Sequence, residues 1–113
     1  FGNGEELIEN FSNRQHYDGK QPVFVSEYGG TAINPEEGAW GYGNCAETTE
    51  ELTERFGLLT DVLMSNKRIC GLCYTQLYDI EQERNGLYTY DRKPKTDPEN
   101  FKKVLDKKAA IEE

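Results

Sequence analysis

The sequence of 113 residues lacks any apolar run that approaches the roughly 20 residues needed to span a membrane. Basic side chains are also few: 13 Lys and Arg stand against 21 Asp and Glu, which gives a formal net charge of −8. Because an acidic chain repels phosphate groups, nucleic acids and anionic membrane surfaces are poor candidate partners. We therefore expect no nucleic acid and no membrane among the partners of this protein.

Cysteine and histidine are scarce as well. The three cysteines, Cys45, Cys70 and Cys73, are odd in number and cannot form a closed set of disulfides within the chain. Cys70 and Cys73 have a C-x-x-C spacing inside an apolar run, which favours two small buried side chains over a redox or zinc pair. A zinc site would need about two more ligands, and His16 is the only histidine. We expect no metal and no cofactor.

A chain of this size is one small domain or a piece of a larger one. Its 7 Tyr, 5 Phe and 1 Trp are too many aromatic residues for an unfolded acidic tail. The chain begins at Phe1 rather than Met, and no signal-peptide pattern follows. We therefore expect a chain that was processed or cut from a longer one.

Stripes of apolar residues alternate with turn signals along the chain. They predict helices at about 4–14, 49–64 and 98–108 and strands at about 22–28 and 69–77. Because strands and helices alternate, the strands should be parallel and the fold class α/β. Two parallel strands leave their outer edges unpaired, so they should belong to a larger α/β fold or complete themselves by association.

The strongest local signals surround the helix predicted at 49–64. Thr48 and Glu51 have the spacing of a capping box at its start. Four apolar residues recur at helical spacing and should form one apolar face: Leu52, Phe56, Leu59 and Leu63. The strand at 69–77 shows little alternation, as expected for a parallel strand that is covered on both faces.

Active sites of parallel α/β folds lie at the carboxyl ends of the strands. The first predicted strand carries Glu27 at its end, and Tyr28, Gly29 and Gly30 follow directly. A glutamate at this place is held rigidly while the glycines leave room for a ligand, which suits a nucleophile or a general base. The alternative is a surface charge that ends a strand.

Several segments carry a resemblance to a known family. Segment 22–30 (PVFVSEYGG) resembles the nucleophile strand of glycoside hydrolase family 2, the β-galactosidase, β-glucuronidase and β-mannosidase family. Segment 71–81 (GLCYTQLYDIE), with 85–87 (NGL) and 91–95 (DRKPK) after it, resembles the eighth strand of that family's barrel and the following loop. These matches lie in the right order and are separated by a predicted helix.

The resemblance implies a TIM (β/α)8 barrel, of which residues 1–113 would form the last quarter with two parallel strands and flanking helices. It also implies a retaining β-glycosidase, in which one carboxylate attacks the sugar and a second, roughly 5 Å away, acts as acid and base. Glu27 matches the nucleophile. The family's acid/base lies in an Asn-Glu pair that this chain lacks, so we expect the chain to be inactive alone. A second carboxylate from Asp79, Glu81 or Glu83 is the less favoured alternative.

The resemblance and the positions at the strand ends and in the loops suggest substrate-binding roles for five further residues: Tyr28, Trp40, Tyr74, Gln76 and Asp79. Three of them have an alternative role: Trp40 could anchor its loop, Tyr28 could pack beneath the loop, and Asp79 could be structural. Many family members place a tryptophan where this chain has Thr75, beside Tyr74. The floor of the sugar pocket should therefore differ here.

Glucuronidases of the family hold the uronate with an Asn-x-Lys pair, and Glu83 and Asn85 stand at the matching positions. Because a glutamate would repel a uronate, we expect a neutral sugar such as galactose and a β-galactosidase-like activity. The expected partners are a carbohydrate substrate and either the remainder of the barrel or a second copy of the chain. Two alternatives are a non-catalytic module that binds carbohydrate or completes a partner's barrel, and a glycosidase of another barrel family.

Overall fold

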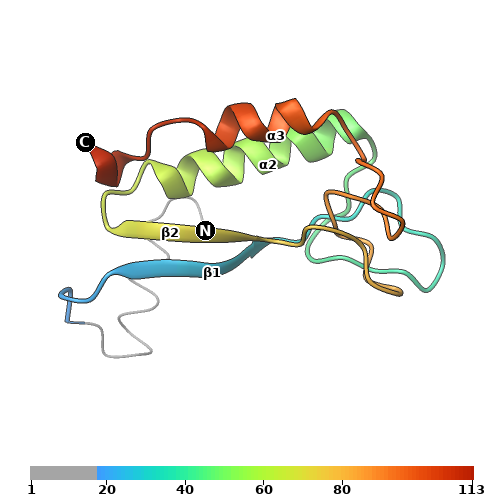
Figure 1. Ribbon diagram of the computed structural model, residues 1–113. Coiled ribbons are helices and arrows are strands. Elements are labelled where there is room, and N and C mark those ends of the chain that lie inside the picture. Colours follow the sequence, from blue (N-terminus) through green and yellow to red (C-terminus); the bar gives the residue numbers. More distant parts are fainter. Residues whose placement is uncertain (1–17) are drawn as a thin grey trace.

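Two parallel strands and two α-helices, joined by long loops, form the framework of the structure, a computed structural model that describes residues 18–113 (Figure 1). The elements in chain order are β1 (Val23–Gly29), α2 (Thr49–Met64), β2 (Ile69–Thr75), α3 (Pro98–Leu105) and the short 3-10 helix η1 (Ala110–Glu112). The expected α/β class and the parallel pairing of the two strands are confirmed. The helix expected at about 4–14 lies outside the described residues. Within residues 18–113, no helix combines the length and the apolar character needed to cross a membrane.

The observed elements lie close to the predicted ones, and two of them end early for local reasons. β2 ends at Thr75 rather than at 77, because the carbonyl of Gln76 accepts a hydrogen bond from the N–H of Leu87 (3.1 Å), away from β1. α3 ends at Leu105 rather than at 108, because the N–H of Asp106 donates back into the last turn and closes the helix.

α2 begins with the predicted cap, but the Glu51 carboxylate bonds the N–H of Glu47 instead of the N–H of Thr48. The Thr48 hydroxyl accepts a hydrogen bond from the N–H of Glu51 (3.1 Å). The Glu51 carboxylate in turn accepts from the N–H of Glu47 (2.8 Å), one residue before the cap. Both bonds satisfy N–H groups that have no partner within the helix, and this fixes the first turn of α2.

The buried face of α2 differs from the prediction at one position. Leu52, Phe56 and Leu63 are buried as expected. Leu59, which shares the predicted apolar face, is 41% exposed, and Thr60 is buried instead. A buried threonine is tolerated here because its hydroxyl hydrogen-bonds the hydroxyl of Tyr28 (2.9 Å).

The helices lie in layers on one face of the sheet (Figure 1). α2 covers β1 and β2, and α3 packs against α2 on the side away from the strands. One cluster of buried apolar side chains joins α2, α3 and the loops: Ala46, Leu52, Phe56, Leu87 and Phe101. A second cluster lies between α2 and the sheet: Val25, Leu63 and Ile69. Apolar burial of this kind is what holds both helices to the strands.

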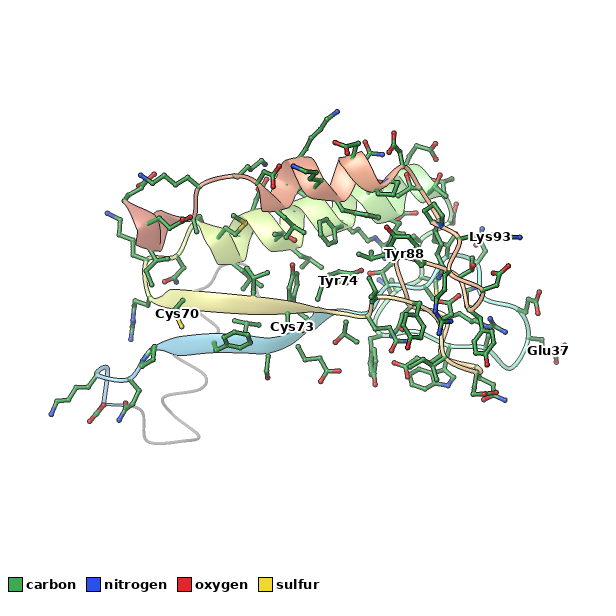
Figure 2. The ribbon with its side chains drawn as sticks, in the orientation of Figure 1. Glu37, Cys70, Cys73, Tyr74, Tyr88 and Lys93 are labelled. Carbon is green, nitrogen blue, oxygen red and sulfur yellow. The ribbon has the colours of Figure 1, made fainter. Side chains whose placement is uncertain are left out.

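No helix within residues 18–113 covers the opposite face of the sheet (Figure 1). Because Val25 packs toward α2 and side chains alternate along a strand, Phe24 faces this uncovered side, and it is 59% exposed. Cys70 and Cys73 are exposed as well, so the predicted burial of both thiols is wrong (Figure 2). The strand register explains part of this result. Between the pairs Val23–Ile69 and Phe24–Gly71, β2 contains one additional residue, Cys70, which interrupts the regular alternation of its side chains.

Candidate active site

The carboxyl ends of both strands lead into two long loops, residues 30–48 and 76–97, which lie together at one end of the sheet (Figure 1). The loops are joined through their backbones. The N–H of Trp40 donates to the carbonyl of Gln82 (2.8 Å), and the N–H of Arg84 donates to the carbonyl of Trp40 (2.8 Å). This connection gives the end of the sheet a fixed rim.

Glu27 lies near the carboxyl end of β1 and is exposed. Between the paired residues Val25 and Tyr28, β1 has two residues where β2 has only Cys73. Such a bulge bends the strand and changes the direction of its side chains. Within residues 18–113, the Glu27 carboxylate has neither a hydrogen-bond partner nor an ion-pair partner. It is therefore free to meet a ligand.

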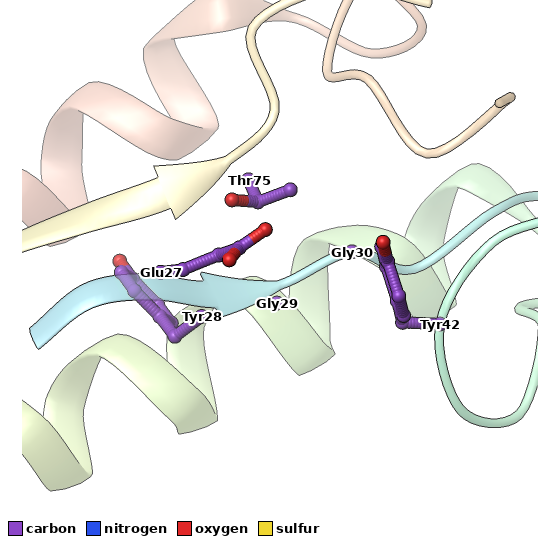
Figure 3. A pocket seen from close by; sticks show the side chains of 6 residues that line it. All are labelled: Glu27, Tyr28, Gly29, Gly30, Tyr42 and Thr75. Atoms are coloured by element: carbon purple, nitrogen blue, oxygen red, sulfur yellow. The ribbon is translucent and has the colours of Figure 1, made fainter.

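A pocket of about 310 Å³ lies beside Glu27 (Figure 3). Its lining residues come from β1, from the end of β2 and from the first loop: Glu27, Tyr28, Gly29, Gly30, Tyr42 and Thr75. Figure 3 shows the Glu27 side chain directed toward Thr75, with Tyr42 on the far side of Gly30. Glu27 is the only one of these residues with a charged side chain, so no cation neutralises it on the pocket wall.

Gly29 and Gly30 allow two aromatic rings to approach the backbone beside the pocket. Both glycines have positive φ, +93° and +76°, a region that other residues rarely adopt. A Cβ on Gly29 would lie 2.2 Å from the ring of Tyr74, and a Cβ on Gly30 would lie 2.6 Å from the ring of Tyr42. Both positions therefore require glycine for conformation and for space.

The two tyrosines expected to bind substrate pack toward α2. The Tyr28 hydroxyl bonds Thr60, and its ring meets Tyr74 edge-on with centroids 5.3 Å apart. Tyr74 also packs against Phe56 (5.0 Å) and lies between β2 and α2 (Figure 2). Burial raises the pKa of Tyr28 above its usual value, and burial raises the pKa of Tyr74 to about 12. Tyr28 contributes to the pocket wall, whereas Tyr74 supports it from behind.

Asp79 is buried and paired rather than open to the pocket. Its Oδ1 accepts hydrogen bonds from the ammonium of Lys95 (2.7 Å) and from the N–H of Gly86 (2.9 Å). Lys95 also donates to the carbonyl of Arg84 (2.9 Å). These bonds tie together the loop after β2, which agrees with the structural alternative for Asp79.

Trp40 and Gln76 lie near the pocket but do not line it. Trp40 meets Tyr42 edge-on, with ring centroids 5.4 Å apart. The side-chain nitrogen of Gln76 is buried and has no hydrogen-bond partner within residues 18–113. Of the predicted substrate-binding residues, only Tyr28 is therefore on the wall beside Glu27.

None of the other carboxylates considered as a second catalytic group lines the Glu27 pocket. Asp79 is held by its ion pair, Glu83 accepts a hydrogen bond from Asn85 (3.1 Å), and Glu81 lines a separate pocket. In the described part of the chain, no three His, Cys, Asp or Glu side chains are grouped so that they could hold a metal ion.

Tyr42 also lines the pocket, although no sequence pattern predicted it as a site residue. Its only signal is the segment 40–43 (WGYG), in which two aromatic residues alternate with glycines. The path of the loop brings it to the site, because the N–H of Tyr42 donates to the carbonyl of Gly30 (2.7 Å). A contact between residues twelve apart in a long loop has no local sequence pattern.

The site therefore offers one unpaired carboxylate in a small pocket with an aromatic wall and no cation. A carboxylate in this setting can act as a nucleophile or as a base. A scan against models of known protein families found no match for this sequence, and a search of curated proteins found none either. The residues of the site are thus the basis for assigning a function.

Proposed function

We propose that the chain is the last quarter of the (β/α)8 barrel of a retaining β-glycosidase similar to glycoside hydrolase family 2, with Glu27 as nucleophile. The position of Glu27 carries the proposal. Its carboxylate is exposed at the carboxyl end of a parallel strand, lines a pocket and has no polar partner within residues 18–113. Carboxyl ends of parallel strands are where barrel enzymes carry their catalytic residues. If Glu27 were only a surface charge at the end of the strand, a pocket beside it would have no purpose.

In this proposal the Glu27 carboxylate attacks C1 of the sugar, the bond from C1 to the leaving oxygen breaks, and a glycosyl ester of Glu27 forms. Water then attacks C1 and releases Glu27, so that the sugar keeps its configuration. The proton for the leaving oxygen, and the base that accepts the proton of water, come from a second carboxylate in the part of the barrel that residues 1–113 do not include. The isolated chain should therefore be inactive toward substrates whose leaving groups need that proton.

The barrel accounts for surfaces that the two strands leave unpaired. β1 pairs only with β2 among the described residues, so each strand keeps one free edge. In a closed barrel both edges pair with neighbouring strands, and no edge is left to aggregate. The face away from α2, which includes the exposed Phe24, would then turn toward the barrel interior.

The composition of the pocket supports a neutral sugar. No Lys or Arg is among the residues that line it, and its one charged side chain is the carboxylate of Glu27. A uronate would bring a second negative charge into the same pocket without a cation to offset the repulsion. A galactoside is therefore the better substrate for the first experiment.

The test uses the protein encoded by the complete reading frame that contains this chain. It is incubated with 2,4-dinitrophenyl 2-deoxy-2-fluoro-β-galactoside, whose leaving group needs no acid and whose fluorine slows hydrolysis of the ester. We expect mass spectrometry to find a stable fluorogalactosyl adduct on the peptide that contains Glu27. Turnover of an ordinary galactoside should fall on the order of 10⁴-fold or more in Glu27→Gln.

The matched control is Glu36→Gln, because Glu36 is an exposed glutamate of the same end of the molecule that lines a different pocket. This variant should keep normal turnover. An adduct on another carboxylate, or normal turnover by Glu27→Gln, would contradict the proposal. Galactose binding without any adduct or turnover would favour the non-catalytic carbohydrate-binding module instead.

A further inference from the structure

We propose that the ring of the reacting sugar stacks on Tyr42, and that Trp40 holds Tyr42 in place for this contact. The inference rests on the proposed role of Glu27 as nucleophile, and it names the side chain of the pocket wall that contacts the sugar ring. Tyr42 lines the same pocket as Glu27, but it comes from the loop after β1 rather than from a strand (Figure 3).

Gly30 holds Tyr42 in place through a backbone hydrogen bond and a close contact with its ring. The N–H of Tyr42 donates to the carbonyl of Gly30 (2.7 Å), and its ring lies where a side chain at position 30 would otherwise be. Tyr42 is nevertheless 51% exposed, so much of the ring is not covered by protein. An aromatic ring that is anchored at one edge and open elsewhere is suited to bind a ligand without losing much conformational entropy.

Trp40 supports Tyr42 from the side. The two rings meet edge-on, with centroids 5.4 Å apart and planes at 89°, which is a favourable aromatic geometry. Trp40 is itself fixed, because its N–H and its carbonyl both bond the loop after β2, at Gln82 and Arg84. Movement of Tyr42 away from the pocket would therefore break a contact with a rigid neighbour.

The size of the pocket assigns Tyr42 to the reacting sugar rather than to the leaving group. A volume of about 310 Å³ lies at the lower end of the roughly 300–1,000 Å³ of ligand pockets, so it suits a single small ring. Glu27 and Tyr42 line this one pocket, so a ring within reach of Glu27 also meets Tyr42. The C–H face of a pyranose is apolar, and the negative face of an aromatic ring attracts such C–H groups.

The experiment measures the inhibition constant Ki of free galactose, and KM and kcat for 4-nitrophenyl β-galactoside, in the complete protein. Tyr42→Ala should raise Ki and KM about ten-fold, because the apolar face of the sugar is no longer covered, and should change kcat less. Tyr42→Phe keeps the ring and should restore most of the affinity for galactose that Tyr42→Ala loses. Tyr90→Ala is the matched control, because Tyr90 is 56% exposed but lines a separate pocket.

An unchanged Ki for galactose in Tyr42→Ala would overturn the inference, even if KM for the nitrophenyl substrate rose, because Tyr42 would then contact only the leaving group. If Tyr42→Ala does not fold, Tyr42→Leu replaces it, since leucine covers Gly30 without an aromatic face, and the same ten-fold rise is expected. The fluorogalactosyl adduct is recorded for every variant. An adduct with an unchanged Ki refutes the role of Tyr42 alone, whereas no adduct in the wild type refutes the proposed function.

The positioning role of Trp40 is tested in the same assays. Trp40→Ala should raise the Ki of galactose while kcat stays close to the wild type, and Trp40→Phe should restore most of the affinity because it keeps a ring edge beside Tyr42. A loss of stability in Trp40→Ala with no change in the Ki of the folded protein would overturn this part of the inference.

Discussion

Adjacent residues at the two strand ends have different surroundings because side chains alternate along a strand. Glu27 and Thr75 line the pocket, whereas the ring of Tyr74 packs behind it, edge-on to Tyr28. Tyr28 opposes Tyr74 in the strand register, and the next pair is Gly29 with Thr75. The position of Glu27 therefore depends on a packed aromatic pair, with Tyr28 in the pocket wall and Tyr74 directly behind it.

The burial of Tyr74 predicts a loss of stability in alkali. Burial raises its pKa to about 12, above the 10.0 of an exposed tyrosine. The unfolded chain loses this proton first, so the contribution to the unfolding free energy is complete below pH 10 and is lost as the pH rises through 12. We expect urea titrations to show a decrease on the order of 2–3 kcal/mol over this interval. Tyr74→Phe should make the pH dependence less steep.

Tyr90→Phe is the control for this titration, because the side chain of Tyr90 is exposed in the folded protein. It should show the wild-type pH dependence. Tyr28 also has a raised pKa, so Tyr74→Phe should keep a smaller slope rather than none. Identical slopes for Tyr74→Phe and the wild type between pH 10 and 12 would contradict the prediction.

At the scale of elements, the ion pair between Lys95 and Asp79 joins the end of β2 to the segment before α3, and both side chains are largely buried. Removal of Lys95 leaves a buried carboxylate without its cation. We expect Lys95→Met to lower the unfolding free energy by about 3–5 kcal/mol, measured by urea denaturation. Lys93→Met removes an exposed pair with Asp91 and should cost less than about 1 kcal/mol. Equal effects of the two variants would show that the buried pair has no special role.

The elements were largely predictable because their signals are local. The spacing of Thr48 and Glu51 and the apolar stripe predicted α2 over its observed range, and the polar run after the second strand indicated a loop. Pairing between strands is not local. The bulge opposite Cys73 and the extra residue at Cys70 depend on how β1 and β2 align, so the sequence predicted two buried thiols that are in fact exposed.

The candidate site was predictable in part for the same reason. The place of Glu27 followed from the rule that strand ends carry the chemistry, and glycines after it indicated open space. The direction of the Tyr74 side chain depends on the register of the two strands. The position of Tyr42 beside the pocket depends on the path of a long loop, in which Tyr42 contacts Gly30 and Trp40. Neither has a pattern in the neighbouring sequence.

At the scale of the whole molecule, the described chain has one covered and one uncovered sheet face (Figure 1). Large apolar side chains are also exposed on its helices, among them Leu58, Leu59 and Leu105. A small two-stranded sheet with a solvated apolar face is rarely stable on its own. The uncovered surface is thus consistent with the proposal that further strands complete the sheet.

We therefore expect the isolated chain to associate in solution, because association covers apolar surface and pairs free strand edges. Sedimentation velocity over a range of protein concentrations should show species larger than the monomer. Phe24→Lys should shift the distribution toward the monomer, because Phe24 is 59% exposed on the uncovered face. Leu77→Lys should not, since Leu77 is 63% exposed but follows β2 in a loop. A wild-type monomer with a cooperative thermal transition would mean that the two strands need no further barrel, and would count against the fragment proposal.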